Sequence, residues 1–458
     1  MSTTAMSVTE KADYKLHEDN HDLDHIPGDF GLPLVGQTFS LVKDLDGTIE
    51  KQLAKYGEVC KFQLSGFKGV LVMGHEAYQQ ILLDKDKNFS AEMGYAQSLG
   101  RFYKGALLLR DFEEHRFQRR MMQTAFKNDA MRGYMADMAP LFDEAIGRWG
   151  SNPDFYFTPN IKQNLLDVAA KIFVGMGELN EDAQKLNTAF LHIAEGMMGI
   201  ITKEWPFTRH RKGKRAERYL NEFFGSLIEE RRAGDGHDTF SHFARELNEN
   251  GEYFSDEDII RHMTFLLFAA HDTTTSALSH IMYYLAKDPV LQQRLRDEVL
   301  AIGKPALAYD DLDKLSDCDA TIKEALRLHP SVQLQQRRTI RECELGGYRI
   351  PANTIIFLAQ SVHQRSDKTW TNPQEFEIDR WMPPRNEYKN HSFAFVGFGG
   401  GAHKCIGMHF ALMNSKMFLH QFLTQYEFEL SPKANHKFTT VPLPNPADGL
   451  PLILKRLT

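Results

Sequence analysis

The sequence predicts a mainly α-helical protein with a small β-rich portion, fused into a single domain. Three observations carry this prediction. Apolar residues recur at helical spacing through most of residues 111–302. Segments with strand-like alternation and turn residues lie on either side of that stretch. The 458 residues, 42% of them hydrophobic, contain no repeat or low-complexity linker that would separate domains.

The first 25 residues are polar, and we expect them to form a disordered tail. They lack the basic start and apolar core of a signal peptide, and no apolar run approaches the ~20 residues of a transmembrane segment. The four cysteines are not closely paired, which favours a reducing compartment. We therefore predict a soluble, cytoplasmic protein. A net charge of −7 argues against nucleic acid as the main partner.

Ordered structure is expected from Ile26, because Pro and Gly within residues 26–36 favour turns. A helix near residues 48–56 precedes a hairpin formed by residues 59–64 and 69–73. Further along, the basic run of residues 210–215 is interpreted as a solvated turn between helices. A membrane or nucleic-acid patch is the alternative for this run.

The clearest helix runs from Asp256 to Lys287. Ser255, with Asp258 three residues later, resembles a capping box, and Asp288-Pro289 supplies the stop. At 1.5 Å per residue this helix is roughly 48 Å long. Its middle, residues 263–270, is apolar nearly all round, so we expect it to be buried.

The last third of the chain alternates between helical and extended segments. A helix is expected over residues 317–328, ending before Pro330, and β structure over residues 343–360. A final helix over residues 408–422 follows a loop rich in glycine. Helices therefore dominate the predicted fold.

The loop before that final helix contains Cys405 between glycines. A cysteine near a helix N-terminus has a lowered pKa, so its thiolate can act as a nucleophile or a metal ligand. The residues alone leave three interpretations open. Cys405 is a buried structural cysteine, a zinc ligand together with His403 and His409, or the single thiolate ligand of a haem iron.

This loop resembles the haem-binding signature of the cytochrome P450 family, F-x-x-G-x-[R/H]-x-C-x-G. Phe398, Gly401, His403, Cys405 and Gly407 fall in register with it. The resemblance implies a single-domain fold over residues 26–458 with a long central helix over haem b. It also implies that Cys405 is the iron ligand, that Phe398 packs near the sulfur and that His403 points at a haem propionate. Gly407 completes the cofactor-binding loop.

Two further motifs match the family. Glu324 and Arg327 fit its E-x-x-R pair, which Arg380 completes as a buried structural network in the family. Taken alone, the pair could be an exposed i,i+3 contact.

The long helix carries Asp272 and Thr273 directly after Ala269-Ala270-His271, similar to the family's [A/G]-G-x-[D/E]-T. Polar groups inside a buried helix are costly unless they are hydrogen-bonded. Taken alone, these residues could therefore be a structural polar patch whose groups are hydrogen-bonded within the helix. The resemblance implies that Asp272 and Thr273 deliver protons during catalysis, beside Ala269 at the cofactor.

Three basic residues match the family's propionate-binding positions. His115 and Arg119 lie at i,i+4 on one helix face, which by itself suits a solvated basic surface. By resemblance they bind one propionate, and Arg337 binds the other, with Arg338 as its competitor.

The resemblance implies a haem-thiolate monooxygenase, an oxidoreductase that inserts one oxygen atom of O2 into a lipophilic substrate by hydroxylation or oxidative demethylation. Because the chain ends soon after the final helix, electrons are expected from a separate ferredoxin or flavodoxin with its NAD(P)H-dependent reductase. We expect basic residues on the cysteine side to dock that partner, namely Arg110, Arg116, Arg120, Lys127 and Lys404. A peroxygenase or isomerase, and a haem-based sensor without turnover, are the alternatives that Asp272 and Thr273 disfavour.

Overall fold

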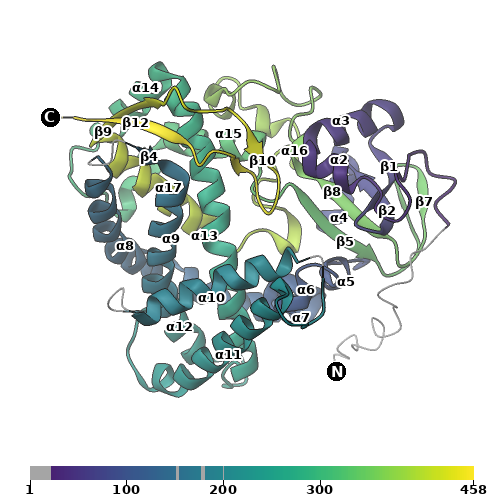
Figure 1. The fold of residues 1–458 in the computed structure, drawn as a ribbon, viewed down its shortest axis with the longest axis horizontal. Helices are drawn as coiled ribbons and strands as arrows, with labels where there is room; N and C mark the ends of the chain where they lie inside the picture. Colours follow the sequence, from purple (N-terminus) through teal and green to yellow (C-terminus); the bar gives the residue numbers. More distant parts are fainter. Residues whose placement is uncertain (1–21, 151–153, 177–180, 200, 458) are drawn as a thin grey trace. The chain divides into compact units, whose positions relative to one another are not determined.

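The computed structural model describes residues 22–150, 154–176, 181–199 and 201–457 (Figure 1). The chain divides into two compact units, each assembled from three stretches of sequence. The first unit consists of the chain up to Arg119 with Val332–Glu375 and Asn386–Cys405, and the second of Arg120–Ser331, Phe376–Arg385 and the chain from Ile406 on.

Most of the tail expected at residues 1–25 lies outside the described residues. Within the described part, Leu23 is fully buried in the same apolar cluster as Ile26. His25 is also held, by a contact of 2.7 Å between its Nε2 and the carbonyl oxygen of Arg349. Packing therefore begins before the expected boundary.

The first unit is organised by a five-stranded sheet in the order β1-β2-β8-β5-β3. Its strands are β1 Val59–Leu64, β2 Phe67–Val72, β3 Phe89–Ser90, β5 Leu334–Thr339 and β8 Ile355–Ala359. The β2–β8 pair is parallel and the other pairs are antiparallel. Because successive side chains of a strand face opposite ways, Ile356 and Ile355 enter different apolar clusters. Both faces of the sheet are therefore covered.

Helices cover the two faces of this sheet. Ile49 of α3 belongs to one apolar cluster and Tyr78 of α4 to the other. The helices and remaining strands of the unit are α2 Thr38–Lys43, α3 Leu45–Tyr56, α4 His75–Leu83, α5 Ala91–Tyr95, α6 Gly100–Tyr103, most of α7 Phe112–Met122, β6 Cys343–Leu345, β7 Tyr348–Ile350 and α16 Gln360–His363. The expected hairpin and the helix before it are confirmed with small shifts of their ends.

The second unit is mainly helical. Its helices are α8 Asn128–Trp149, α9 Phe157–Val174, α10 Glu181–Met197, α11 Arg209–Ala233, α12 Thr239–Arg245, α13 Asp256–Lys287, α14 Pro289–Leu300, α15 Ser316–Leu328 and α17 Met408–Leu423. Its short strands are β4 Phe155–Tyr156, β9 Tyr426–Leu430, β10 Phe438–Thr439, β11 Asn445–Pro446 and β12 Pro451–Arg456. Among the helices of the described ranges, none is both long and apolar enough to cross a bilayer.

Helix α13 has the bounds that the sequence predicts, and its ends show why. The Ser255 side chain accepts a hydrogen bond from the backbone N–H of Asp258 at 3.1 Å, which caps the N-terminus. At the other end Asp288 caps the next helix, and Pro289 occupies the first turn of that helix. The middle of α13 is buried against α9, α11 and α15.

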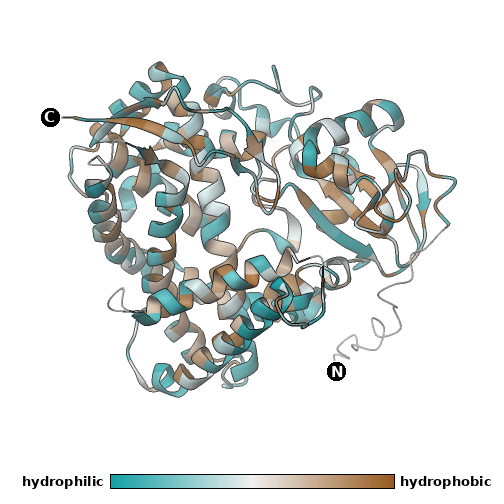
Figure 2. Ribbon diagram, viewed as in Figure 1, coloured by the Kyte–Doolittle hydropathy of each residue, from teal (hydrophilic) through white to brown (hydrophobic). Residues whose placement is uncertain are grey.

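The interpretation of residues 210–215 as a turn between helices is wrong. Helix α11 begins at Arg209, so the basic run forms its first two turns. Thr208 explains this start, because its side chain accepts a hydrogen bond from the N–H of Arg211 at 3.2 Å. Figure 2 shows the contrast between the hydrophilic α11 and the more apolar α13.

Candidate functional site

The loop that contains Cys405 is closed by its own backbone. The N–H of Cys405 donates to the carbonyl oxygen of Phe398 at 2.8 Å. Gly399 and Gly401 hold positive φ angles of 70° and 61°. A Cβ at Gly401 would also lie 1.7 Å from the carbonyl oxygen of Leu82, so only glycine fits there. The glycines thus fix the path of the backbone that carries the thiol.

His363, the last residue of α16, and Gln364, directly after it, hold the chain just before this loop. The N–H of Val396 donates to Oε1 of Gln364 at 2.7 Å, and Gln364 is fully buried. Its neighbour His363 places Nε2 at 2.7 Å from the carbonyl oxygen of Phe393. Buried side-chain hydrogen bonds of this kind restrict the loop to one position. The Gln364 side-chain amide thus fixes the backbone that leads into the loop.

The four cysteines differ in what they can bind. Burial raises the pKa of Cys60 to about 12 and that of the half-buried Cys343 to about 11. Burial also raises the pKa of Cys318 well above its usual value. Cys405 alone is exposed. Since the thiolate is the form that binds a metal, Cys405 is the cysteine suited to that chemistry.

Nitrogen donors from three elements of the first unit gather near this cysteine. His115 and Arg119 lie on α7, and the His115 ring centroid is 4.0 Å from that of His403. The negative charge of Cys405 acts on the Arg119 guanidinium, although burial lowers its pKa overall. Arg337, on β5, is almost fully buried. Burial and the charges of Arg119 and Arg337 lower the pKa of His115 to about 4, so its ring is neutral at pH 7.

Arg337 and Arg338 face different surroundings. Nη1 of Arg338 donates to Oδ1 of Asn353 at 2.9 Å, whereas Nη1 of Arg337 donates to the carbonyl oxygen of Gln336 at 2.8 Å. Successive residues of a strand point to opposite sides. The charge of Arg337, and not that of Arg338, acts on His115. Arg337 is therefore the arginine on the side of the histidines.

This donor set fits an anionic, two-carboxylate group such as haem. Neither Arg119 nor Arg337 has an ion-pair partner among the residues that the structure describes, although Arg337 is almost fully buried and Arg119 is partly buried. A buried guanidinium without a counter-ion is costly, so an anion is needed beside Arg337. The zinc alternative fails on geometry, because no three His, Cys, Asp or Glu side chains of the described ranges come close enough to share a metal.

Sequence reasoning missed Asp111, which organises the same region. Its carboxylate is buried and accepts hydrogen bonds from the Ser90 hydroxyl at 2.5 Å and the Ala91 N–H at 2.8 Å. Oδ1 of Asp111 also lies 4.0 Å from Nε2 of His403. Asp111 precedes α7, and its carbonyl oxygen accepts from the N–H of His115 at 3.1 Å. The sequence signal that could have indicated Asp111 is its position, since an acidic residue directly before a helix often has a structural role there.

In the second unit, one stripe of α13 is accessible although the rest of its middle is buried. Phe265, Phe268, Ala269, Asp272 and Thr273 are all partly exposed. Their spacing of three and four residues places them on one helix face. The Thr273 hydroxyl donates to the carbonyl oxygen of Ala269 at 2.7 Å, and Ser331 donates to the carbonyl oxygen of Thr273 at 2.9 Å. The predicted pair of Asp272 and Thr273 thus lies on an open, largely apolar face.

Asp272 has a partner that the sequence did not indicate. Nζ of Lys162, on α9, lies 2.8 Å from Oδ1 of Asp272. The His271 ring is also near, with Nε2 3.4 Å from the same oxygen. Nδ1 of His271 lies 2.8 Å from the carbonyl oxygen of Leu267, and burial lowers the pKa of this ring. A neutral His271 that donates through Nδ1 leaves Lys162 as the cation on Asp272.

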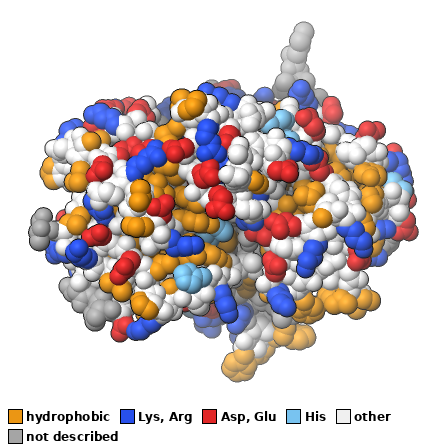
Figure 3. All heavy atoms as spheres, turned by 90° about the horizontal axis from the view of Figure 1, so that it is seen from above, with side chains coloured by type: hydrophobic (Ala, Val, Ile, Leu, Met, Phe, Trp, Pro, Cys, Tyr) orange, Lys and Arg blue, Asp and Glu red, His pale blue; other side chains and the backbone are white. Residues whose placement is uncertain are grey.

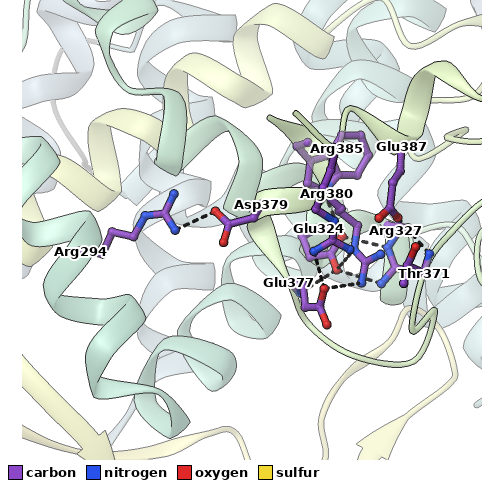
Figure 4. Close-up of polar contacts among 10 residues, drawn as sticks. Arg294, Glu324, Arg327, Thr371, Glu377, Asp379, Arg380, Arg385 and Glu387 are labelled. Atoms are coloured by element: carbon purple, nitrogen blue, oxygen red, sulfur yellow. Dashed lines mark hydrogen bonds and ion pairs between the residues drawn. The ribbon is translucent and has the colours of Figure 1, made fainter. Parts of the chain in front are cut away.

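Glu324 is the centre of a buried network (Figure 4). Its two carboxylate oxygens accept from Nε and Nη2 of Arg327, both at 2.8 Å. They also accept from Nε of Arg380 and from Nε1 of Trp381, both at 2.9 Å. Glu324, Arg327 and Arg380 are completely buried. The predicted contact of Arg380 with the E-x-x-R pair is present.

Most of the cations expected to dock a partner are already paired. Arg110 pairs with Glu114 at 2.5 Å, Arg116 pairs with Glu113 at 2.6 Å, and Arg120 pairs with Glu249. Figure 3 shows the same mixing of basic and acidic side chains over one face of the molecule. Lys404 is exposed and has no ion-pair partner among the described residues. Three of the five residues expected to dock a partner thus have their charge partly offset by a neighbouring carboxylate.

Comparisons with known proteins show the family of the whole chain. The family model for cytochrome P450 matches residues 26–448. Cytochrome P450 136 of Mycobacterium tuberculosis (strain H37Rv) is 36% identical over 436 residues, covering 94% of this chain and 88% of the relative. Cytochrome P450 26B1 of Mus musculus is 26% identical, covering 92% and 85%. The structure of retinoic acid bound cyanobacterial CYP120A1 has a TM-score of 0.85 at 27% identity, covering 94% of this chain and 99% of that one.

Proposed function

The chain belongs to the cytochrome P450 family of haem-dependent monooxygenases, and from this premise we propose that Cys405 would supply the thiolate ligand of its haem iron. The observation that carries the proposal is the contrast among the thiols. Cys405 alone is exposed, in a loop that its own hydrogen bond to Phe398 and two left-handed glycines hold in place. When bound, haem with a thiolate ligand supplies the activation of dioxygen.

The cationic donors of the first unit would hold the carboxylates of the haem. Arg119 and Arg337 supply the charge, and His115 and His403 supply ring N–H groups. Arg337 is preferred to Arg338 because its charge acts on His115, while Arg338 is engaged by Asn353. Asp111 is a positioning residue, because its carboxylate lies beside His403 and its carbonyl oxygen bonds α7.

Asp272 and Thr273 would handle protons on the accessible face of α13. The Thr273 hydroxyl already donates to Ala269, so its oxygen is free to accept a second hydrogen bond. The Asp272 carboxylate is held by Lys162 at 2.8 Å. To exchange a proton with the site, Asp272 must loosen that ion pair. Lys162 therefore positions the acid and tunes how readily it acts.

The substrate would be a lipophilic molecule that packs against Phe265 and Phe268 of α13. Their rings are 6.2 Å apart and both are partly exposed. Retinoic acid is the first compound to test, because the CYP120A1 structure was solved with it bound. We infer oxygen insertion into a C–H bond of such a substrate, with electrons from a separate ferredoxin or flavodoxin and its reductase.

The experiment that tests this function combines a binding and a turnover measurement. Addition of retinoic acid to the purified holoprotein should shift the Soret band from low spin to high spin. With a surrogate reductase system, NAD(P)H and O2 should then be consumed in step with an oxidised product. A spin shift without any substrate-dependent consumption would instead favour a sensor without turnover.

We expect Thr273→Ala to divert reducing equivalents to peroxide and Asp272→Asn to slow turnover by about 100-fold. Both side chains are predicted to act after substrate binds, so the substrate-induced Soret shift should persist in both variants. Peroxide yield and product formation per NAD(P)H measure the effect. Loss of haem in both variants, or normal coupling and rate in both, would contradict the assignment.

The proposed role of Lys162 in positioning Asp272 can be tested by substitution of both residues. Lys162→Met should change the turnover rate, and Lys162→Arg should restore it because Arg keeps the cation. In an Asp272→Asn background, Lys162→Met should have no further effect, since the two residues act through one contact. Independent effects in the double variant would separate Lys162 from proton handling.

The charge on the cysteine side of the first unit predicts the response to a redox partner. Reduction by an acidic ferredoxin should slow as salt rises, because exposed charges are screened over about 8 Å at physiological ionic strength. Lys404→Glu should slow it further, since Lys404 has no ion-pair partner among the described residues. Arg116→Glu is the matched control with a smaller effect, because Glu113 already offsets that charge. A salt-independent rate with an unimpaired Lys404→Glu variant would place docking on another surface.

A further inference from the structure

We propose that Gly94 and Tyr95, at the end of α5, position Arg337 for contact with a haem carboxylate. All three residues belong to the first unit, with Arg337 on β5. The inference rests on the proposed function, because it takes Arg337 as a carboxylate-binding residue. It goes beyond that function by assigning a role to a helix that supplies none of the predicted cofactor-binding residues.

Helix α5 lies directly against the backbone of Arg337. A Cβ atom at Gly94 would be 2.7 Å from Cα of Arg337 and 2.8 Å from its backbone nitrogen. The strand could not easily move away, because Arg337 is paired with Ile356 of β8. Only glycine therefore lets α5 approach β5 so closely. The contact at Gly94 sets where the backbone of Arg337 lies.

The hydroxyl of Tyr95 holds the same strand one residue earlier. The backbone N–H of Gln336 donates to Oη of Tyr95 at 3.2 Å, and Tyr95 is buried. Ser98 adds a second contact, because its hydroxyl donates to Oε1 of Gln336 at 3.2 Å. The carbonyl oxygen of Gln336 in turn accepts from Nη1 of Arg337 at 2.8 Å. The residue that Tyr95 holds is thus the one that orients the guanidinium.

The start of α5 is anchored to Asp111. The Ser90 hydroxyl and the Ala91 N–H both donate to the Asp111 carboxylate, at 2.5 Å and 2.8 Å. The same carboxylate lies 4.0 Å from Nε2 of His403. Helix α5 therefore connects the surroundings of His403 with the strand that carries Arg337.

A short helix that is held at both ends fixes the separation between its anchors, because its backbone advances by about 1.5 Å per residue. Here the anchors are the Asp111 carboxylate and the backbone of β5. Groups that are in position before a ligand arrives bind it more tightly, since less freedom is lost on binding. This matters for Arg337, because a charge-assisted hydrogen bond weakens steeply when its geometry is disturbed.

The test is the rate at which the purified holoprotein releases haem to an excess of apomyoglobin. Tyr95→Phe removes only a hydroxyl, and release should be about fivefold faster because Gln336 loses its acceptor. Gly94→Ala should speed release about tenfold, since the new Cβ displaces β5. Arg337→Gln should speed release by about tenfold or more. In that background Tyr95→Phe should have little further effect, because it acts through Arg337.

The midpoint reduction potential of the haem is the second readout. Loss of a nearby cation makes uptake of an electron less favourable, so the potential should fall in Arg337→Gln. It should fall by a smaller amount in Tyr95→Phe, which keeps the cation but loosens its support. A general loss of stability would not move the potential in this direction.

Matched controls remove the same groups in the second unit. Tyr426 is buried on β9, and its hydroxyl donates to the carbonyl oxygen of Ile146 at 3.2 Å, so Tyr426→Phe also deletes one buried hydrogen bond to the backbone. Gly133 lies on α8, where an added Cβ would meet no described atom within 4 Å. Tyr426→Phe and Gly133→Ala should release haem at the rate of the unaltered protein, with an unchanged potential.

The outcomes separate this inference from the proposed function. If Arg337→Gln speeds haem release but Tyr95→Phe does not, the inference fails and the role of Arg337 stands. If Arg337→Gln leaves release unchanged, the role of Arg337 fails and the inference fails with it. Fully additive effects of Tyr95→Phe and Arg337→Gln would also overturn the inference. Tyr95→Phe preserves the shape of the side chain, so it decides the outcome even if Gly94→Ala does not fold.

Discussion

The Cys405→Ser variant should lose the red-shifted Soret band that a thiolate-ligated haem shows when it is reduced and exposed to carbon monoxide. A serine hydroxyl is not ionised at neutral pH and cannot replace the electron donation of a thiolate. Monooxygenase activity should disappear with the band. Difference spectra of the reduced protein with and without carbon monoxide measure the effect directly.

The other cysteines are the controls for this experiment. Burial raises the pKa of Cys60 to about 12, and Cys343 lies at the start of β6 with a pKa raised to about 11. Cys60→Ser and Cys343→Ser should therefore keep the band. If Cys405→Ser kept it as well, or if either control lost it while still folded, the thiolate would belong to another residue.

Glu324→Ala should destabilise the fold by about 3–5 kcal/mol, because it leaves two buried guanidinium groups without their carboxylate. That loss is comparable to the whole stability of many domains, about 5–15 kcal/mol, so much of the variant should not fold. The N–H donors of Trp381 and Glu377 also lose their acceptor. Chemical denaturation, followed by circular dichroism, measures the change.

The control removes a carboxylate from an exposed pair. Glu144 and Arg148 pair at 3.0 Å on α8, and both side chains are about two-thirds exposed. Glu144→Ala should therefore change the free energy of unfolding by at most about 1 kcal/mol. Equal stability losses in the two variants would show that burial is not what makes the Glu324 network important.

Local rules predicted the elements whose ends are set by their own sequence. Helix α13 begins after Ser255 and ends before Pro289, as its capping residues require. A capping residue, Thr208, also precedes α11. The basic charge of residues 210–215 nevertheless outweighed this cap in the prediction from the sequence, which placed a turn there. The Thr208 cap starts that helix at Arg209, inside a run that composition alone assigned to a turn.

Contacts between segments that are distant in the chain could not be predicted from the sequence. Lys162 and Asp272 are separated by 110 positions, and only the packing of α9 against α13 brings them together. The Arg120–Glu249 pair likewise joins residues that no local pattern connects, and it removes a cation from the expected docking set. In contrast, His115 and Arg119 share one helix face, so their proximity followed from spacing alone.

The central claim is that this chain inserts one oxygen atom of dioxygen into a lipophilic substrate. Turnover of retinoic acid under isotopically labelled dioxygen, with NAD(P)H and a surrogate redox system, tests it most directly. We expect one labelled oxygen atom in each product molecule and no product from the Cys405→Ser variant. A product whose new oxygen comes from water, or no product although retinoic acid shifts the Soret band, would contradict it.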